Sequence, residues 1–186
     1  MSKTNNFVLW SLYIIAWLIF VGLSIEAGGL VINFFFSLYN PEFVQNLYQK
    51  LDLTEMYKDS KMAFFGIYSF ILLISILKAF LFYIVIRLMH KIDLTKPFNT
   101  FVSNQILQIS YYTLSIGLLS FIARQVAKSL IHYGYATDSL NQFWVDSQAF
   151  IVMGSVVYII AIIFKKGVDI QNEIDLTVST SEFTMI

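Results

Sequence analysis

Apolar residues are concentrated in four stretches of the 186-residue chain, and charged residues flank each stretch. The stretches cover approximately residues 7–25, 63–89, 106–124 and 148–164. A bilayer core of about 30 Å is crossed by about 20 apolar residues at about 1.5 Å per residue of helix. Inside lipid, backbone N–H and C=O groups need internal partners, which requires helices. The pattern predicts an all-α, integral-membrane bundle of four transmembrane helices that forms a single domain. The lipid bilayer is then a partner of this domain.

The first stretch also has features of a signal peptide, because Lys3 precedes it and Ala27 offers a small residue for cleavage. Its apolar core is longer than the roughly 7–15 residues of such a signal, and no A-x-A-like site follows. We therefore expect it to remain as the first span. Residues 30–39 are apolar again, and the pair Gly28-Gly29 predicts a kink or break before them.

The segments between the spans carry signals of their own. Asn40 has the character of an N-cap and Pro41 that of a first helical residue, and the apolar positions that follow recur at helical spacing. This predicts a short amphipathic helix in the first loop, either lying on the membrane or capping the span ends. Pro97 marks a short loop, so spans two and three are expected to be antiparallel neighbours. Residues 129–147 have the composition of an exposed loop.

Composition and charge narrow the classes of function. Hydrophobic residues make up 58% of the chain and charged residues 13%, against roughly 25% charged in soluble domains. A formal net charge of zero gives no indication of nucleic-acid binding. Because there is no cysteine, disulfides and thiolate metal sites are excluded.

Orientation depends on the distribution of Lys and Arg. The two orientations differ by a single charge, but Arg87, Lys91 and the pair Lys165-Lys166 lie close to span ends on one side. This density favours a multi-pass protein of the cell membrane with both termini, including the tail at residues 167–186, in the cytoplasm. Trp144 is then expected near a membrane interface, where aromatic residues gather.

Charged residues at membrane depth are expensive and often functional, and Lys78 interrupts the second span. Its stem would either snorkel toward the Arg87 end or place an ammonium inside the bundle as an ion pair or partner-binding group. Glu26 is the acid near span one, but it lies toward the opposite surface from Arg87. Asp169 and Glu173, together with Asp93, would therefore meet a snorkelling ammonium more easily.

The third span carries small and polar residues at alternating steps of three and four, which places them on one helix face. They are Ser110, Thr113, Gly117, Ser120, Arg124 and Ala127. Small residues at this spacing let another helix approach, and hydroxyls can bond across the gap. We interpret this stripe as the internal seam of the bundle, with a homo-oligomer contact or a polar conduit as alternatives, and expect this helix to be the most enclosed.

Catalytic and metal chemistry finds little support in the sequence. His90 and His132 are the two histidines, and the predicted topology places them on opposite sides of the membrane. There is no zinc-protease helix motif, phosphate loop or nucleophile elbow. We therefore predict no catalytic residue, metal site or cofactor, and a protein that is not an enzyme.

Two segments carry a resemblance to a known family. The chain closing the fourth span runs Phe-Lys-Lys-Gly-Val-Asp-Ile-Gln-Asn-Glu-Ile-Asp-Leu-Thr-Val from Phe164, and a Pro-Phe pair precedes span three. Both resemble the bacterial domain-of-unknown-function family 2975, whose members are four-span membrane proteins. Asn172 departs from the pattern, because the family more often has an acid there. The matching positions are Pro97, Phe98, Phe164, Gly167, Gln171, Glu173, Asp175 and Leu176.

The resemblance implies that the protein acts with a protein partner, and it implies no catalysed reaction. Members of this family are often encoded beside a small helix-turn-helix regulator, so the implied function is a membrane regulatory or accessory component. The tail after Gly167 would either present acids to a cytoplasmic protein partner or form a disordered cap. A small oligomeric channel or transporter, based on Lys78 and the stripe, and an immunity-type membrane protein are the alternatives.

Overall fold

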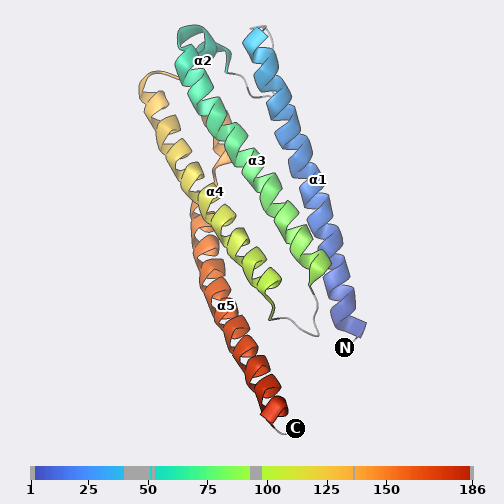
Figure 1. Ribbon diagram of the computed structural model, residues 1–186. Coiled ribbons are helices and arrows are strands. Elements are labelled where there is room, and N and C mark those ends of the chain that lie inside the picture. The colour runs from blue at the N-terminus through green and yellow to red at the C-terminus, as the bar shows by residue number, and fades with distance from the viewer. Residues whose placement is uncertain (1–2, 40–50, 52, 93–97, 136, 185–186) are drawn as a thin grey trace.

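The computed structural model describes residues 3–39, 51, 53–92, 98–135 and 137–184. Its elements are the α-helices α1 (Lys3–Tyr39), α2 (Thr54–Asp59), α3 (Lys61–Lys91), α4 (Thr100–His132) and α5 (Ser147–Thr184), and the 3-10 helix η3 (Asp138–Phe143). Helices α1, α3, α4 and α5 are long and apolar enough to cross a membrane (Figure 1), so the predicted fold class is confirmed.

A short amphipathic helix, α2, lies in the first loop as predicted. The sequence assigned it to residues 40–51, of which 40–50 lie outside the described residues, and Leu51 is buried but not part of a helix. In α2 the side chains of Met56 and Tyr57 are buried, while those of Glu55 and Lys58 are exposed. The helix therefore packs against the ends of the long helices, which supports its interpretation as a cap.

The first span does not break at its glycines. Helix α1 is continuous from Lys3 to Tyr39 and is about 55 Å long at about 1.5 Å per residue, so it either tilts in a bilayer core of about 30 Å or extends beyond it. Past Gly28, α1 is held by its neighbours: the Tyr68 hydroxyl donates to the Leu30 carbonyl at 3.1 Å. The Tyr57 hydroxyl donates to a second carbonyl, 3.3 Å away, on α1. These contacts outweigh the weak helix propensity of glycine.

Caps explain why α3 and α4 are longer than their apolar runs. The Ser60 hydroxyl accepts from the backbone N–H of Ala63 at 3.3 Å, and the Asn99 side chain accepts from that of Val102 at 2.9 Å. Helix α4 thus begins at Thr100 and includes a polar first turn that the apolar window left out.

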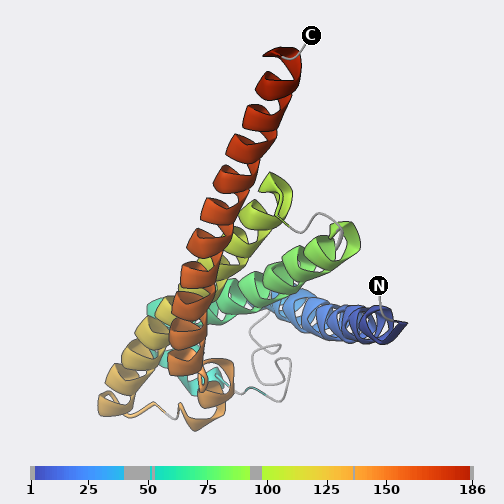
Figure 2. The same cartoon turned by 90° about the horizontal axis from the view of Figure 1, so that it is seen from below.

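The four long helices form an open row. Helix α1 packs against α3, α3 against α4, and α4 against α5 (Figure 1). Helices α3 and α4 are antiparallel neighbours, as the short loop between them predicted. Figure 2 shows α1 and α5 pointing in different directions at the two edges of the row.

The core lies where α1, α2, α3, α4 and η3 meet. Tyr57, Phe64 and Tyr68 are buried, and the Phe64 ring contacts the Tyr57 ring edge to face at 5.1 Å and the tilted Tyr68 ring at 5.5 Å. The prediction that residues 129–147 form an exposed loop is wrong here, because η3 and its flanks fold into the core. Leu140 is fully buried and Trp144 is 1% exposed, so Trp144 is a core residue. The apolar side chains of this loop are too widely spaced to stand out as a span.

Helix α5 continues through Gly167 to Thr184, so Gly167 does not end it. The red end of α5 in Figure 2 reaches well beyond the ends of the neighbouring helices. The tail is therefore helical to Thr184, which corrects the alternative of a disordered cap.

Candidate functional site

Lys78 points toward the start of α5. Its ammonium donates to the Phe143 carbonyl at 3.4 Å and lies 5.8 Å from the centre of the Phe150 ring. The prediction that Lys78 snorkels toward Arg87 is wrong, because Phe143 precedes α5 and lies in the opposite direction along α3. The polar group that the ammonium reaches is the Phe143 carbonyl, in the segment between α4 and α5.

The carboxylates of Glu26 on α1 and Asp146 at the start of α5 attract the Lys78 ammonium at long range. Neither carboxylate forms a salt bridge with Lys78 within the described residues, which agrees with the expectation that Glu26 and Lys78 would not pair directly. Asp169 and Glu173, the acids expected nearer to a snorkelling ammonium, lie in the part of α5 that follows Gly167, while Asp93 is outside the described residues.

Two buried polar side chains near Lys78 have atoms without a hydrogen-bond partner in the described part of the chain. The indole nitrogen of Trp144 and the hydroxyl of Ser147 are buried without a hydrogen-bond partner among the described residues. Both residues, with Lys78, Asp146 and Ser120, line a cavity of about 10 Å³, room for about one water molecule. Burying an unpaired polar group is unfavourable, so such a cluster suggests a binding role. The sequence pattern did not reveal Trp144, Asp146 and Ser147, because they lie in what resembles a loop.

The stripe on α4 faces α5. A Cβ at Gly117 would lie 2.7 Å from Cγ1 of Ile151, and one at Gly154 would lie 2.8 Å from the backbone of Leu114. Only glycine allows this approach, so the interpretation as an internal seam is supported by the packing. Five members are buried and Arg124 is partly exposed; the buried ones are Ser110, Thr113, Gly117, Ser120 and Ala127.

The stripe hydroxyls do not all bond across the seam. Ser110 donates to the Leu107 carbonyl at 2.8 Å and Thr113 to the Ile109 carbonyl at 2.7 Å, both within α4. Helix α3 is buried to the same extent as α4, so α4 is not the most enclosed helix. With glycine contacts closing the seam, the stripe does not line a conduit between α4 and α5.

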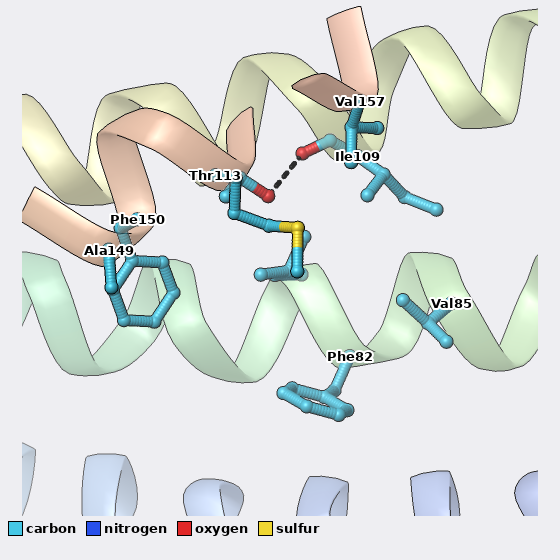
Figure 3. A pocket seen from close by; sticks show the side chains of 9 residues that line it. Phe82, Val85, Ile109, Thr113, Ala149, Phe150 and Val157 are labelled. Carbon is cyan, nitrogen blue, oxygen red and sulfur yellow. Dashed lines mark hydrogen bonds between the residues drawn. The ribbon is translucent and has the colours of Figure 1, made fainter. Parts of the chain in front are cut away.

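An apolar groove of about 510 Å³ lies between α3, α4 and α5. Figure 3 shows Phe150 at one end and Val85 and Val157 toward the other. Thr113 also lines the groove, but its hydroxyl is turned to the Ile109 carbonyl, which leaves the wall apolar (Figure 3).

The two segments that carry the family resemblance meet in space. The rings of Phe98 and Phe164 lie 4.7 Å apart, and a Cβ at Gly167 would lie 2.9 Å from Cδ1 of Phe98. The pattern Phe-Lys-Lys-Gly therefore has a packing reason, since Gly167 makes room for the Phe98 ring. Gln171 is partly exposed and Leu176 is exposed. Pro97 and the side chain of Asp175 are outside what the structure describes.

Aromatic residues hold the basic groups at the far end of α3. The Arg87 guanidinium and the Lys91 ammonium lie 5.8 and 5.4 Å from the centre of the Phe101 ring, and the His90 ring stacks on Tyr13 at 6.3 Å. His132 ends α4 at the opposite end of the bundle (Figure 1). The described residues hold no cluster of metal-ligating side chains.

Comparisons of the chain with protein-family models, with curated proteins and with solved structures give no match. The family resemblance and what it implies therefore stay predictions.

Proposed function

We propose that this protein is a multi-pass component of the cell membrane that holds a cytoplasmic protein partner on the extension of α5. The charge density near the span ends supports a cytoplasmic location for both termini. The observation that carries the proposal is the continuous helix from Ser147 to Thr184, whose last part runs past the other helices (Figure 2).

The extension offers a surface for a partner. Ile170, Ile174 and Leu176 are each more than half exposed, which is unfavourable for apolar side chains outside a membrane. Asp169 and Glu173 are exposed beside them. A partner with an apolar groove bordered by Lys or Arg fits this combination.

The base of the extension is fixed in direction. Val168 is 5% exposed, and Gly167 packs on the Phe98 ring immediately before the extension begins. A rigid base lowers the entropy lost when a partner binds. The small helix-turn-helix regulator implied by the family resemblance is the partner we propose, which makes the protein a regulatory or accessory component with no enzymatic activity of its own.

Transport and immunity-type functions have less support. The closed seam at Gly117 and the small cavity beside Lys78 oppose a polar conduit at these places. No feature of the described residues indicates protection against a peptide.

Crosslinking in native membranes tests the proposal. Full-length protein is compared with a chain ending after Val168, which keeps the Phe98 contact, and with the double variant Ile170→Asp/Ile174→Asp. Asn172→Asp is the matched control, because Asn172 is exposed on the same segment. We expect one protein to be captured by full-length and control chains and lost from the other two. Equal capture by all four chains, or none by the full-length chain, contradicts the proposal.

A further inference from the structure

The apolar groove between α3 and α5 has a polar end. Lys78, Leu81, Phe82 and Val85 occupy positions i, i+3, i+4 and i+7 of α3 and so share one face, and the last three line the groove. Lys78 therefore lies one turn beyond the apolar lining. Phe150 lines both the groove and the small polar cavity, so the two spaces adjoin.

The α5 wall has the same layout. Ala149, Phe150, Met153 and Val157 line the groove, and Asp146 precedes them by one turn. The Asp146 carbonyl accepts the N–H of Phe150 at 3.0 Å, so Asp146 stands at the first turn of α5. Both walls thus run from apolar side chains to a charged residue, and the charges have opposite sign.

Hydrogen-bond donors gather at this end. Lys78 has three N–H donors, and the structure gives one hydrogen bond, to Phe143 at 3.4 Å. The indole N–H of Trp144 and the hydroxyl of Ser147 are buried and unpartnered among the described residues. The cavity of about 10 Å³ is too small for a phosphate group and has room for about one water molecule, which the indole and hydroxyl donors can bind. A phosphate must therefore lie at the mouth of the cavity, where its oxygen accepts from the Lys78 ammonium.

Lys78 lies level with the first turn of α5, where the fourth span begins, because it contacts Phe143 and shares a cavity with Asp146 and Ser147. We propose that the groove binds one acyl chain of a bilayer phospholipid whose phosphate contacts Lys78 at this end of the span. The groove volume of about 510 Å³ lies within the roughly 300–1,000 Å³ of ligand pockets, and its lining is apolar. Asp146 lines the same small cavity as Lys78, and its carboxylate beside the ammonium disfavours a purely anionic headgroup. A zwitterionic ethanolamine headgroup matches the site, with its phosphate on Lys78 and its amine toward Asp146.

Native mass spectrometry of the purified full-length protein tests this site. The protein is exchanged with vesicles that contain equal parts of phosphatidylethanolamine, phosphatidylglycerol and phosphatidylcholine, with added free fatty acid. Val157→Trp fills the groove, and Val156→Trp is the matched control because Val156 is the next residue, exposed and outside the groove lining. Lys78→Met removes the charge and keeps the length of the stem. Thermal unfolding establishes that each variant is folded.

We expect one retained phosphatidylethanolamine per chain, equal retention in Val156→Trp, and loss in Val157→Trp. Lys78→Met should lower retention about tenfold or more, because a hydrogen bond to a charged group is lost. Equal retention in all variants overturns the proposal. Retention of fatty acid, phosphatidylglycerol or phosphatidylcholine in place of phosphatidylethanolamine also overturns it, because each identifies another occupant. If Val157→Trp does not fold, Lys78→Met decides: unchanged lipid retention contradicts the site.

Discussion

Glycine has opposite roles in the two outer helix pairs. Between α4 and α5, Gly117 and Gly154 each lie so close to the partner helix that a Cβ would come within 2.8 Å of it. In α1, Gly22 and Gly28 have no atom within 4 Å of the place where a Cβ would stand. The first pair is joined by close backbone approach, whereas α1 is held to α3 by aromatic rings and tyrosine hydroxyls. A glycine in an apolar helix therefore indicates a contact only when its neighbours also have the spacing for one.

The largest effect is expected at the α4–α5 seam. Gly117→Leu forces the backbone of α5 away, because Ile151 and the Ser147 carbonyl occupy the space. Overpacking of this kind destabilises by about 3 kcal/mol. Gly28→Leu is the control and should lose less than about 0.5 kcal/mol. Unfolding by SDS titration of both variants measures the difference, and equal losses would contradict the contrast between the two pairs.

Each single contact that holds α1 should contribute less to the stability than the α4–α5 seam does. Tyr68→Phe keeps the ring and removes the hydrogen bond to the Leu30 carbonyl, at a cost of about 1 kcal/mol. Tyr83→Phe is the control and should be neutral, because the Tyr83 ring also faces α1, at Phe20, but its hydroxyl forms no hydrogen bond with the described residues. The same SDS titration measures the stability of both variants. A neutral Tyr68→Phe would show that ring packing alone holds α1.

The base of the α5 extension gives a smaller, coupled effect. Gly167→Ala places a Cβ 2.9 Å from Cδ1 of Phe98, and the ring must shift. We expect a loss of about 1 kcal/mol in the parent and almost none when Phe98 is already leucine, because the residues are in contact. A double-mutant cycle with Phe98→Leu measures the coupling. If the losses of stability from the two substitutions are additive, position 167 does not interact with the Phe98 ring.

The smallest effect is a gain. Gly28→Ala adds a methyl group where no atom lies within 4 Å and raises the helix propensity of α1. The stability should increase by up to about 1 kcal/mol. Gly154→Ala is the comparison, and there the same methyl group should destabilise. An increase at both positions would remove the distinction on which the contrast between the helix pairs depends.

The sequence predicted the parts of this fold that depend on the length of apolar stretches and on the spacing of small residues within them. Four apolar stretches gave four helices, and the spacing of Ser110, Gly117 and Ser120 gave the buried face of α4. It failed where tertiary contacts decide. The hydroxyl of Tyr68 helps hold α1 beyond Gly28, where the sequence predicted a kink or break, and the sequence did not reveal that Gly167 makes room for Phe98.

Of the residues at the candidate site, the sequence predicted one, Lys78. Lys78 stood out because a charge in an apolar span is rare, but its direction depended on groups whose position the chain pattern does not reveal. Trp144, Asp146 and Ser147 come from a segment without helical periodicity, and only the fold of η3 against the core brings them to Lys78. Polar residues of irregular segments reach a site through topology, which hydrophobic patterning does not encode.

Disulfide formation in native membranes tests the α4–α5 seam most directly. The chain has no cysteine, so an introduced pair reacts without background. We predict that Tyr111→Cys/Tyr158→Cys oxidises readily with a membrane-permeant oxidant, because the rings of Tyr111 on α4 and Tyr158 on α5 lie 6.1 Å apart across the seam and neither substitution puts a side chain at a glycine. Tyr111→Cys/Val152→Cys, whose second position is exposed away from this contact, should stay reduced. A reduced first pair, or equal oxidation of both pairs, would contradict the seam as described.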